Sequence, residues 1–423
     1  MNMQIAILGR QHKISLAELE ALFGAKNIIP LADFAALVNS DQSLPQQYLG
    51  GTIKSAKLLT RLEGTTLSEA FIYLQQTIPE LLDSIPEGKL QLGISVYGFT
   101  AKRDWLLKQT LALKKIIRNA GRSVRIIENK KEALETAQVL YNKLTSPLGL
   151  ELLLLKDEDD TLVAQTTAVQ DINAYAARDY GRPMRDAYVG MLPPKLAQIM
   201  INLSMNKAKP NRDNRKLQIL DPFCGTGVVL QEALLMGYEV FGSDLSQKMI
   251  DYTTSNLAWL KENYSNLGTI LTIEQADATI HKWVEANIID SVVSETYLGK
   301  PLTSLPSSQK LNSIMNETNA IVEKFLKNIA PQLNPGTILC LALPAWNKNG
   351  CQRSEVRCQR PGCTHQTLDF RHHTSNIYHL KVLDHLSDLG YNRLEFVHAT
   401  NSELIYHRKD QVVARELTIL KKI

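Results

Sequence analysis

The 423-residue sequence lacks several features that would place it in a special class of protein. No stretch approaches the roughly 18 consecutive apolar residues that a membrane-spanning helix needs. The first ten residues carry no charged leader ahead of a short apolar run, which predicts a first strand rather than a signal peptide. Hydrophobic residues make up 44% and charged residues 21%, so the composition does not indicate disorder. The length predicts two or three domains, each able to bury a core.

Cysteine is scarce, with five residues, an odd number. A long chain without an export signal and with so few cysteines is typical of a reducing compartment, so we expect a cytoplasmic protein. Three of the cysteines lie close to three histidines, but no C-x-x-C pair occurs there, and a zinc site needs about four ligands. We expect a basic, solvated loop without metal at 347–375, with a zinc site as the alternative. The residues concerned are Cys351, Cys358, Cys363, His365, His372 and His373.

The stretch 217–244 predicts a strand, a glycine turn, a helix and a second strand in succession. Glycines in the turn let the backbone approach a ligand and adopt dihedral angles that a side chain disfavours. A right-handed crossover brings the acids that follow the two strands to the same carboxyl edge of a parallel sheet. The elements are a strand at 217–220 ending at Asp221, a turn with Gly225 and Gly227, a helix at 228–236 stopped by Gly237, and a strand at 238–242 leading to Asp244.

Two phosphate-binding fingerprints are incomplete in this stretch. A dinucleotide fingerprint needs a glycine where the chain has Leu230, and a phosphate loop needs a lysine where it has Val228. A carboxylate at Asp221 would repel a pyrophosphate but suits the ammonium and sulfonium charges of S-adenosylmethionine. Asp244 would accept hydrogen bonds from the ribose hydroxyls. The pattern therefore indicates an S-adenosylmethionine site, in which Cys224 is typical of a small buried residue.

The rest of the second half predicts a doubly wound domain. Strands alternate with helices whose apolar residues recur at helical spacing, and each strand is followed by polar residues. Asp277, after the third strand, is placed to meet an adenine. The expected elements are strands at 270–274, 288–293 and 337–343, a long helix at 311–329, a helix at 377–389 stopped by Gly390, and a closing antiparallel pair at 404–406 and 412–420.

The first half, up to about residue 165, predicts an α+β domain for binding rather than chemistry. It contains no glycine nucleotide turn and no catalytic cluster. The expected elements are a strand at 3–8, a helix preceded by a capping box of Ser15 and Glu18 with Glu18 and Glu20 in water, a strand at 90–96, a helix at 105–120, and a hairpin of 150–155 with 162–167.

A basic segment is the most pronounced feature of this half. Residues 102–131 hold ten basic residues against two acids, Asp104 and Glu128. Such clustering is typical of a stripe that binds RNA phosphates, whereas an ordinary solvated helix face, the alternative, usually mixes both signs. The expected RNA contacts are Lys102, Arg103, Lys114, Lys115, Arg118, Arg122 and Arg125.

The amino-terminal region resembles a THUMP module with its preceding ferredoxin-like subdomain. The resemblance rests on 16–24 (LAELEALFG), 49–54 (LGGTIK), 93–98 (GISVYG) and 137–144 (AQVLYNKL). It implies an RNA-binding region at 1–170 that holds the acceptor end of tRNA. A polar linker at 171–193, with Arg178, Arg182 and Arg185, is expected to follow, and Pro194 to begin the first helix of the next domain.

Nearly the whole chain resembles the THUMP-containing tRNA guanosine N2-methyltransferases. The segments that carry this resemblance are 182–204, 220–244 and 404–422. It implies a class I, Rossmann-like methyltransferase domain at 194–423, S-adenosylmethionine as cofactor and tRNA as substrate. Cofactor contacts carry over to Asp221, Gly225, Gly227, Asp244 and Asp277, and Pro222, Cys224, Leu245 and Ala278 complete the expected set.

The motif after the fourth strand departs from the family pattern. Members carry an acid, asparagine or serine followed by two prolines and an aromatic residue, whereas this chain has Ser294, Glu295, Thr296 and Tyr297. We expect Ser294 and Glu295 to accept hydrogen bonds from an exocyclic amine and Tyr297 to stack on the extruded base. The alternatives are a non-catalytic RNA-binding paralogue and a DNA amino-methyltransferase. The oligomeric state is left open.

Overall fold

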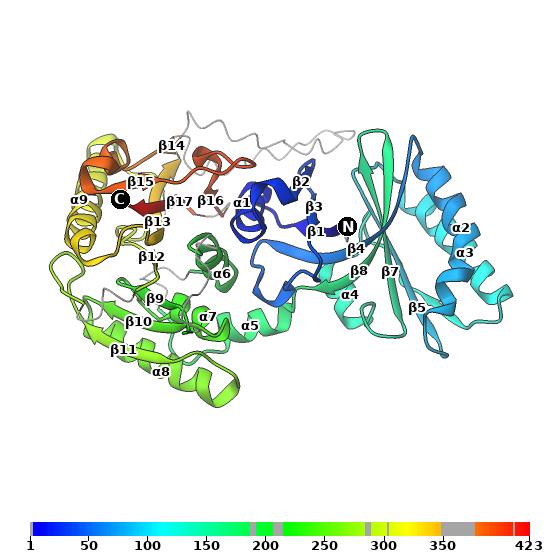
Figure 1. Ribbon diagram of the computed structural model, residues 1–423, viewed down its shortest axis with the longest axis horizontal. Coiled ribbons are helices and arrows are strands. Elements are labelled where there is room, and N and C mark those ends of the chain that lie inside the picture. The colour runs from blue at the N-terminus through cyan, green and yellow to red at the C-terminus, as the bar shows by residue number, and fades with distance from the viewer. Residues whose placement is uncertain are drawn as a thin grey trace. The chain divides into compact units, whose positions relative to one another are not determined.

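The computed structural model of the chain describes residues 3–186, 192–205, 215–283, 289–302, 304–347, 377–408 and 411–423 (Figure 1). The chain divides into two compact units, Met1–Gly181 and Arg182–Ile423. We call them unit 1 and unit 2, and we describe each by itself.

Unit 1 is built on one mixed sheet. Its described strands follow the order β2-β3-β1-β4-β8-β7-β5-β6. Neighbours are antiparallel except that β5 runs parallel to β6 and β7, which gives the α+β arrangement expected for this half. The strands are β1 Met3–Leu8, β2 Ile28–Leu31, β3 Ala35–Asn39, β4 Thr52–Leu62, β5 Leu90–Tyr97, β6 Val124–Ile126, β7 Gly149–Asp157 and β8 Asp160–Val169. The predicted hairpin is confirmed, because β7 pairs with β8 up to Asp157 and Asp160.

The helices of unit 1 follow the apolar spacing of the sequence. They are α1 His12–Phe23, α2 Leu67–Asp83, α3 Arg103–Asn119, α4 Thr136–Tyr141 and α5 Ile172–Tyr180, with short 3₁₀ turns at Ala25–Asn27 and Gln46–Tyr48. Figure 1 shows α2 and α3 next to each other over β5. Their apolar faces form one core with the sheet, since Phe71, Leu74, Leu113 and Ile117 are buried in a cluster with Leu92.

The predicted capping box at the start of α1 is wrong. Gln11 is the N-cap, and Ser15 and Glu18 lie inside the helix with their side chains buried. The Glu18 carboxylate accepts hydrogen bonds from the backbone amides of Gly50 at 2.9 Å and Gly51 at 2.8 Å, and the Ser15 hydroxyl donates to the Gly51 carbonyl at 2.9 Å. Both side chains therefore satisfy a distant glycine turn instead of the first turn of their own helix.

The expected polar linker at 171–193 begins with a helix. Asp171 caps α5 by accepting hydrogen bonds from the amides of Asn173 at 3.0 Å and Ala174 at 2.9 Å. Tyr175 and Arg178 of α5 are buried, and the Arg178 guanidinium lies 4.6 Å from the Tyr175 ring centre. The polar composition of this segment predicted a linker, whereas its first part is a capped helix.

Unit 2 is a doubly wound sheet. Its main strands follow the order β11-β10-β9-β12-β13-β17-β15; β9 to β13 are parallel, and β17 is antiparallel to β13 and β15. The described strands are β9 Gln218–Asp221, β10 Glu239–Asp244, β11 Ile270–Gln275, β12 Ser291–Glu295, β13 Ile338–Asn347, β14 Ile377–Tyr378, β15 Tyr391–Arg393, β16 Ile405–Tyr406 and β17 Val413–Lys422. The Rossmann-like fold expected from the sequence is therefore confirmed.

Helices cover both faces of this sheet. α6 Pro194–Leu203, α7 Val228–Leu235 and α8 Gln247–Asn263 precede the reversal of winding, and α9 Ser308–Ile329 follows it. Figure 1 shows α9 on the opposite side of the sheet from α6 and α7. Alternate residues of β13, namely Leu339, Leu341 and Leu343, are buried in one cluster with Val322 and Phe325 of α9. Pro194 occupies the first turn of α6, as predicted.

The carboxyl-terminal part corrects one further prediction. Residues 377–389 form β14 and then two short 3₁₀ helices within Lys381–Leu389 rather than one α-helix; the kink between them is at His385 (φ −140°, ψ 34°). Gly390 does stop the segment, in the left-handed conformation (φ 85°). The predicted closing pair is confirmed, since β16 is antiparallel to β17. Further 3₁₀ turns are Ala330–Gln332 and Asn401–Glu403.

Candidate active site

Three carboxylates lie at the ends of neighbouring strands in unit 2. Asp221 ends β9, Asp244 ends β10 and Glu295 ends β12. β9 lies between β10 and β12, and the winding of the sheet reverses between β9 and β12. In doubly wound sheets, ligands bind outside the carboxyl ends of the strands at such a reversal. The topology therefore marks this edge as the candidate site.

The turn between β9 and α7 has the backbone that its glycines predicted. Gly225 and Gly227 have φ values of 52° and 83°, in the left-handed region, and Gly227 is the N-cap of α7. A Cβ atom at Gly227 would lie 3.0 Å from the Thr253 methyl group. The Gly225 amide donates to the Asp244 carboxylate at 3.0 Å, so the turn is fastened to the end of β10.

Two side chains of α8 hold the same turn. The Thr253 hydroxyl donates to the Gly225 carbonyl at 2.8 Å, and the Asn256 amide donates to the Thr226 carbonyl at 2.8 Å. Asn256 also exchanges two hydrogen bonds with the backbone of Met184, at 2.9 and 3.0 Å. The sequence analysis missed both residues. Their spacing of three on the helix after the second acid is the signal that would have indicated them.

Asp221 is the most buried of the three carboxylates, with 1% of its surface exposed. It accepts hydrogen bonds from the Ser294 hydroxyl at 2.6 Å and from the Phe223 amide at 3.2 Å. Burial raises the pKa of Asp221 to about 7, and the charges of Asp244 and Glu295 add to the shift. Burial also raises the pKa of Asp244, although the amides of Gly225 and Ser246 oppose it. Poorly hydrated negative charges are therefore concentrated at this edge, and a bound cation would reduce the repulsion between them.

The residues expected to form the catalytic pocket differ in their surroundings. Ser294 is buried, and its hydroxyl donates to the carboxylate of Asp221 on the neighbouring strand β9. Glu295 accepts a hydrogen bond from Arg415 of β17, a residue that the sequence analysis missed. Tyr297 is partly buried, and burial, followed by the charge of Glu317, raises the pKa of its hydroxyl.

The expected adenine side contains a restrained acid and exposed apolar groups. The hydroxyl and amide of Thr279 donate to Asp277 at 2.7 and 2.9 Å, and they hold the pKa of that carboxylate below its usual value. Leu245 and Ile280 are 68% and 72% exposed after β10 and β11. Large exposed aliphatic side chains at a sheet edge are suited to contact with an apolar ring.

The remaining expected cofactor residues are buried. Pro222 and Ala278 are buried, and Ala278 belongs to the main core cluster of unit 2. Burial raises the pKa of the Cys224 thiol, which lies 3.8 Å from the Thr253 hydroxyl. Cys224 is therefore a small buried thiol, as the sequence analysis expected.

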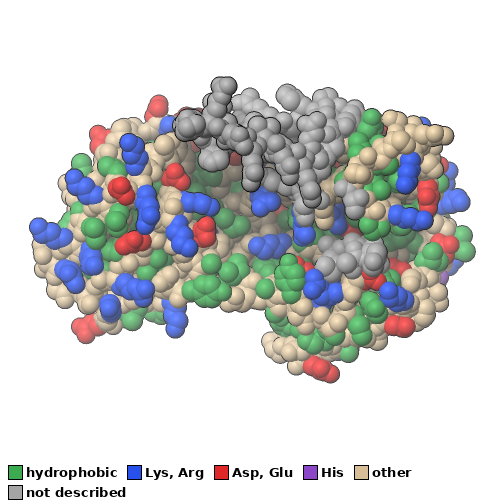
Figure 2. Space-filling model, turned by 180° about the vertical axis from the view of Figure 1, so that it is seen from behind, with side chains coloured by type: hydrophobic (Ala, Val, Ile, Leu, Met, Phe, Trp, Pro, Cys, Tyr) green, Lys and Arg blue, Asp and Glu red, His purple; other side chains and the backbone are tan. Residues whose placement is uncertain are grey.

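The expected RNA stripe lies on and after α3 of unit 1. Lys102, Lys115, Arg118 and Arg125 are exposed, and Lys114 is partly exposed. Figure 2 shows Lys and Arg side chains over unit 1, on the left of that view, among hydrophobic and acidic ones.

The Arg122 guanidinium, by contrast, donates to the carbonyls of Leu82 at 3.2 Å, Ile85 at 2.9 Å and Pro86. Arg122 thus also fastens the segment after α2. This second role distinguishes it from the other residues of the stripe.

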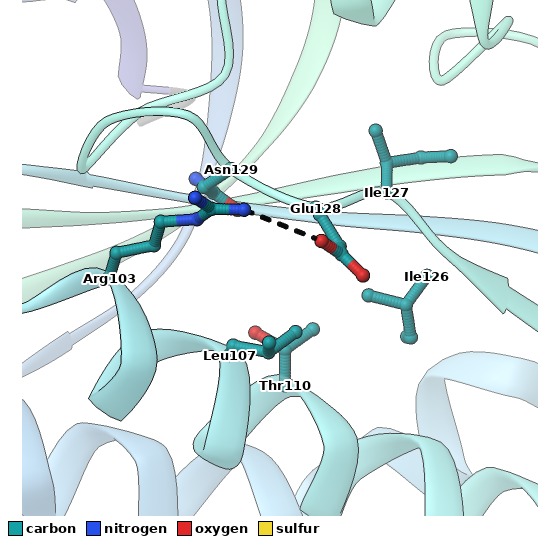
Figure 3. A pocket seen from close by; sticks show the side chains of 7 residues that line it. All are labelled: Arg103, Leu107, Thr110, Ile126, Ile127, Glu128 and Asn129. Atoms are coloured by element: carbon teal, nitrogen blue, oxygen red, sulfur yellow. Dashed lines mark ion pairs between the residues drawn. The ribbon is translucent and has the colours of Figure 1, made fainter.

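A small hollow lies beside the start of α3 (Figure 3). The Arg103 guanidinium and the Glu128 carboxylate point toward each other across it and pair at 3.7 Å. It has room for about one water molecule, so we assign it no ligand. The lining residues are Arg103, Leu107, Thr110, Ile126, Ile127, Glu128 and Asn129.

Two other predictions concern metal and membrane. No group of three or more His, Cys, Asp or Glu residues is arranged to hold a metal within the part of the chain that the structure describes. The six residues weighed for zinc, Cys351, Cys358, Cys363, His365, His372 and His373, lie outside the described residues. Among the described helices, none is both long and apolar enough to cross a membrane.

Known proteins similar to this chain are methyltransferases. Residues 182–329 match the family described as "UPF0020: RMKL-like, methyltransferase domain". The tRNA (guanine(10)-N2)-dimethyltransferase of Methanothermobacter thermautotrophicus is 33% identical over 168 residues, which are 40% of this chain and 42% of that protein. The Pyrococcus abyssi protein of the same name is 36% identical over 101 residues, 23% of this chain and 26% of that protein.

Solved structures are more distant. TrmN from Thermus thermophilus aligns over 100% of both chains with 15% identity and a TM-score of 0.47. The chain spans less than half the length of the first two curated relatives that it matches, 42% and 29%. Residues 182–329 of unit 2 are therefore similar to a methyltransferase domain, and the doubly wound sheet gives unit 2 the Rossmann-like fold.

Proposed function

We propose that the protein is an S-adenosylmethionine-dependent RNA methyltransferase that acts on the exocyclic N2 amine of a guanosine in tRNA. The observation that carries this proposal is the set of carboxylates at the reversal of the unit 2 sheet, beside a turn whose two glycines adopt left-handed φ values. The relatives from Methanothermobacter thermautotrophicus and Pyrococcus abyssi are named for this reaction, which supports the choice of substrate.

The residues at this edge fit S-adenosylmethionine. Its sulfonium and ammonium charges would relieve the repulsion that helps to raise the pKa of Asp221. Asp244 accepts one backbone amide on each oxygen, from Gly225 and Ser246, which orients the remaining lone pairs toward ribose hydroxyls. Leu245 would pack on the adenine. When bound, the cofactor supplies a methyl group to a nucleophile and departs as S-adenosylhomocysteine.

The proposed catalytic residues are Ser294, Glu295 and Tyr297. The guanosine amine has its lone pair delocalised into the ring, so acceptors for its protons help to aim the nitrogen. Glu295 would accept one N–H hydrogen bond and take up the proton that the nitrogen loses when its new bond to carbon forms. Ser294 fixes the Asp221 carboxylate, and Tyr297 offers a ring face to the extruded base.

Glu295→Gln and Tyr297→Ala are expected to keep cofactor affinity while losing turnover. Loss of a positioned proton acceptor costs about 10² to 10⁴-fold in rate, and loss of a stacked ring removes about 1 to 3 kcal/mol of substrate binding. The measurement is transfer of a labelled methyl group to unmodified tRNA, with the exposed Glu262→Gln as control. Full activity in both variants would remove these residues from the mechanism, and an inert wild type would favour a non-catalytic RNA-binding protein.

Unit 1 is the proposed RNA-binding part. We propose a ferredoxin-like and THUMP region at 1–170 that holds the tRNA acceptor end, a connection at 171–193 and the methyltransferase domain at 194–423. The mixed sheet of unit 1 and the exposed basic side chains of α3 support this assignment.

Reversing Lys114, Lys115 and Arg118 to glutamate is expected to weaken RNA binding. The slope of log affinity against log salt should flatten by about 0.7 for each phosphate that the variant no longer neutralises, while cofactor affinity stays unchanged. A matched control reverses Lys57, Lys89 and Lys156, which are exposed on unit 1 outside the stripe. Equal effects of the two triple variants would mean that α3 has only a general electrostatic influence.

A further inference from the structure

β17 carries two consecutive charged residues that form separate ion pairs. Because neighbours on a strand point to opposite faces, Arg415 and Glu416 serve different sides of the sheet. The Arg415 side chain is 4% exposed; its Nε donates to Oε1 of Glu295, and its Nη1 donates to Gln411 at 3.1 Å. Glu416 accepts from Arg393 at 2.9 Å and pairs with His379 at 2.6 Å.

The strand between the two partners has short side chains on the shared face. β13 lies between β12 and β17, with Ala342 opposite Glu295 and Pro344 opposite Arg415. Residues directly opposite each other in a sheet point to the same face. The guanidinium can therefore cross β13 above small residues and reach the end of β12.

We propose that Arg415 is a positioning residue that fixes one oxygen of Glu295, so that the second oxygen of this carboxylate can receive the substrate amine. The inference rests on the proposed function, which it deepens by naming what makes Glu295 competent. Arg415 acts through Glu295 in this proposal, because its Nε donates to that carboxylate and its Nη1 donates to Gln411.

The charges around Glu295 explain the need for such a partner. Asp221 of β9 repels Glu295, and Asp244 of β10 adds negative charge to the same edge. Burial raises the pKa of Glu295, and Arg415 first, then Arg408 after β16, oppose that shift. Without Arg415, the carboxyl group would hold its proton to higher pH and would lose its acceptor character.

The test is the pH dependence of kcat for methyl transfer by wild type, Arg415→Met and Arg415→Lys. In Arg415→Met the acidic limb is expected to move upward by about 1 to 3 pH units, with KM for tRNA and cofactor affinity within about twofold of wild type. Arg415→Lys keeps the positive charge, so its acidic limb should lie close to that of wild type. A fall in kcat with an unmoved limb, or equal losses in both variants, would overturn the proposal.

Arg393→Met is the matched control for a merely structural effect. It breaks the partly buried ion pair between Arg393 of β15 and Glu416, which follows Arg415 on β17 and points to the other face of the sheet. We expect it to lower the melting temperature as Arg415→Met does without moving the limb. A shift of the limb in this control would assign the effect to the sheet as a whole and overturn the proposal.

A second readout does not depend on turnover. The melting-temperature loss caused by Arg415→Met should be larger at pH 8 than at pH 4.5, and it should disappear in a Glu295→Gln background. If wild type transfers no methyl group but this coupling is present, the proposed function fails and the charged pair stands. If the coupling is absent, the inference fails even when wild type is active.

Discussion

Asp221→Asn is expected to raise the free energy of unfolding by about 2 to 4 kcal/mol at pH 8 while it abolishes cofactor binding. Asparagine keeps an oxygen that can accept from Ser294 and Phe223, so the hydrogen bonds survive. What disappears is the cost of a buried charge, which raises the pKa of this carboxyl from 3.8 to about 7.

The sign of the pH dependence follows from that shift. The folded state holds a proton on Asp221 that the unfolded state releases above pH 3.8, so the stabilisation from this group is full below that pH and is lost as pH rises through about 7. Asp221→Asn should therefore match wild type near pH 4 and exceed it at pH 8. Chemical denaturation across this range measures the difference, with the exposed Asp251→Asn as control. A variant less stable than wild type at pH 8 would contradict the assigned burial.

Lys54→Met is expected to destabilise unit 1 by about 3 to 5 kcal/mol, because it leaves a buried carboxylate without its cation. The side chains of Lys54 and Glu151 are 1% and 0% exposed, and Nζ lies 2.5 Å from Oε1. Lys54 also donates to the Leu134 carbonyl at 2.8 Å, and the hydroxyls of Ser95 and Thr166 donate to Glu151, each at 2.6 Å. Burial lowers the pKa of Lys54, and Glu151 opposes that shift.

The control for this variant lies on the same strand. Lys57→Met removes an exposed lysine of β4 and should change stability by less than about 0.5 kcal/mol. In the double variant Lys54→Met/Glu151→Gln the carboxylate is gone, so part of the lost stability should return. Denaturation of the full chain, with hydrogen exchange of the β7 amides to follow unit 1, measures these differences. Equal effects of Lys54→Met and Lys57→Met would show that the buried pair contributes nothing specific.

The sequence predicted those parts of the fold that depend on local order. From β9 to β10, the residues of each segment favour the strand or helix that they form. The right-handed crossover between the two parallel strands then places Asp221 and Asp244 at one edge of the sheet. The same reasoning failed for Glu18, because the residues near it in sequence resemble a capping box while its real partners are the amides of Gly50 and Gly51.

Contacts between segments that are distant in the sequence could not be predicted from it. Arg415 lies 120 residues from Glu295, and Glu151 lies 97 residues from Lys54, so no spacing rule links either pair. The role of Ser294 was also missed in part. Its position after the fourth strand suggested an acceptor for the substrate, yet its hydroxyl donates to Asp221, a partner that only the pairing of β9 with β12 brings near.

The most direct test of the proposed function identifies the methylated nucleoside. Purified protein is incubated with unmodified tRNA and S-adenosylmethionine carrying a labelled methyl group, and the digested RNA is analysed by mass spectrometry, with Asp244→Ala as the cofactor-site control. We expect label in N2-methylated guanosine with wild type and none with Asp244→Ala. Label in another nucleoside, label only when DNA is offered, or no transfer by a wild type that binds the cofactor would contradict the assignment.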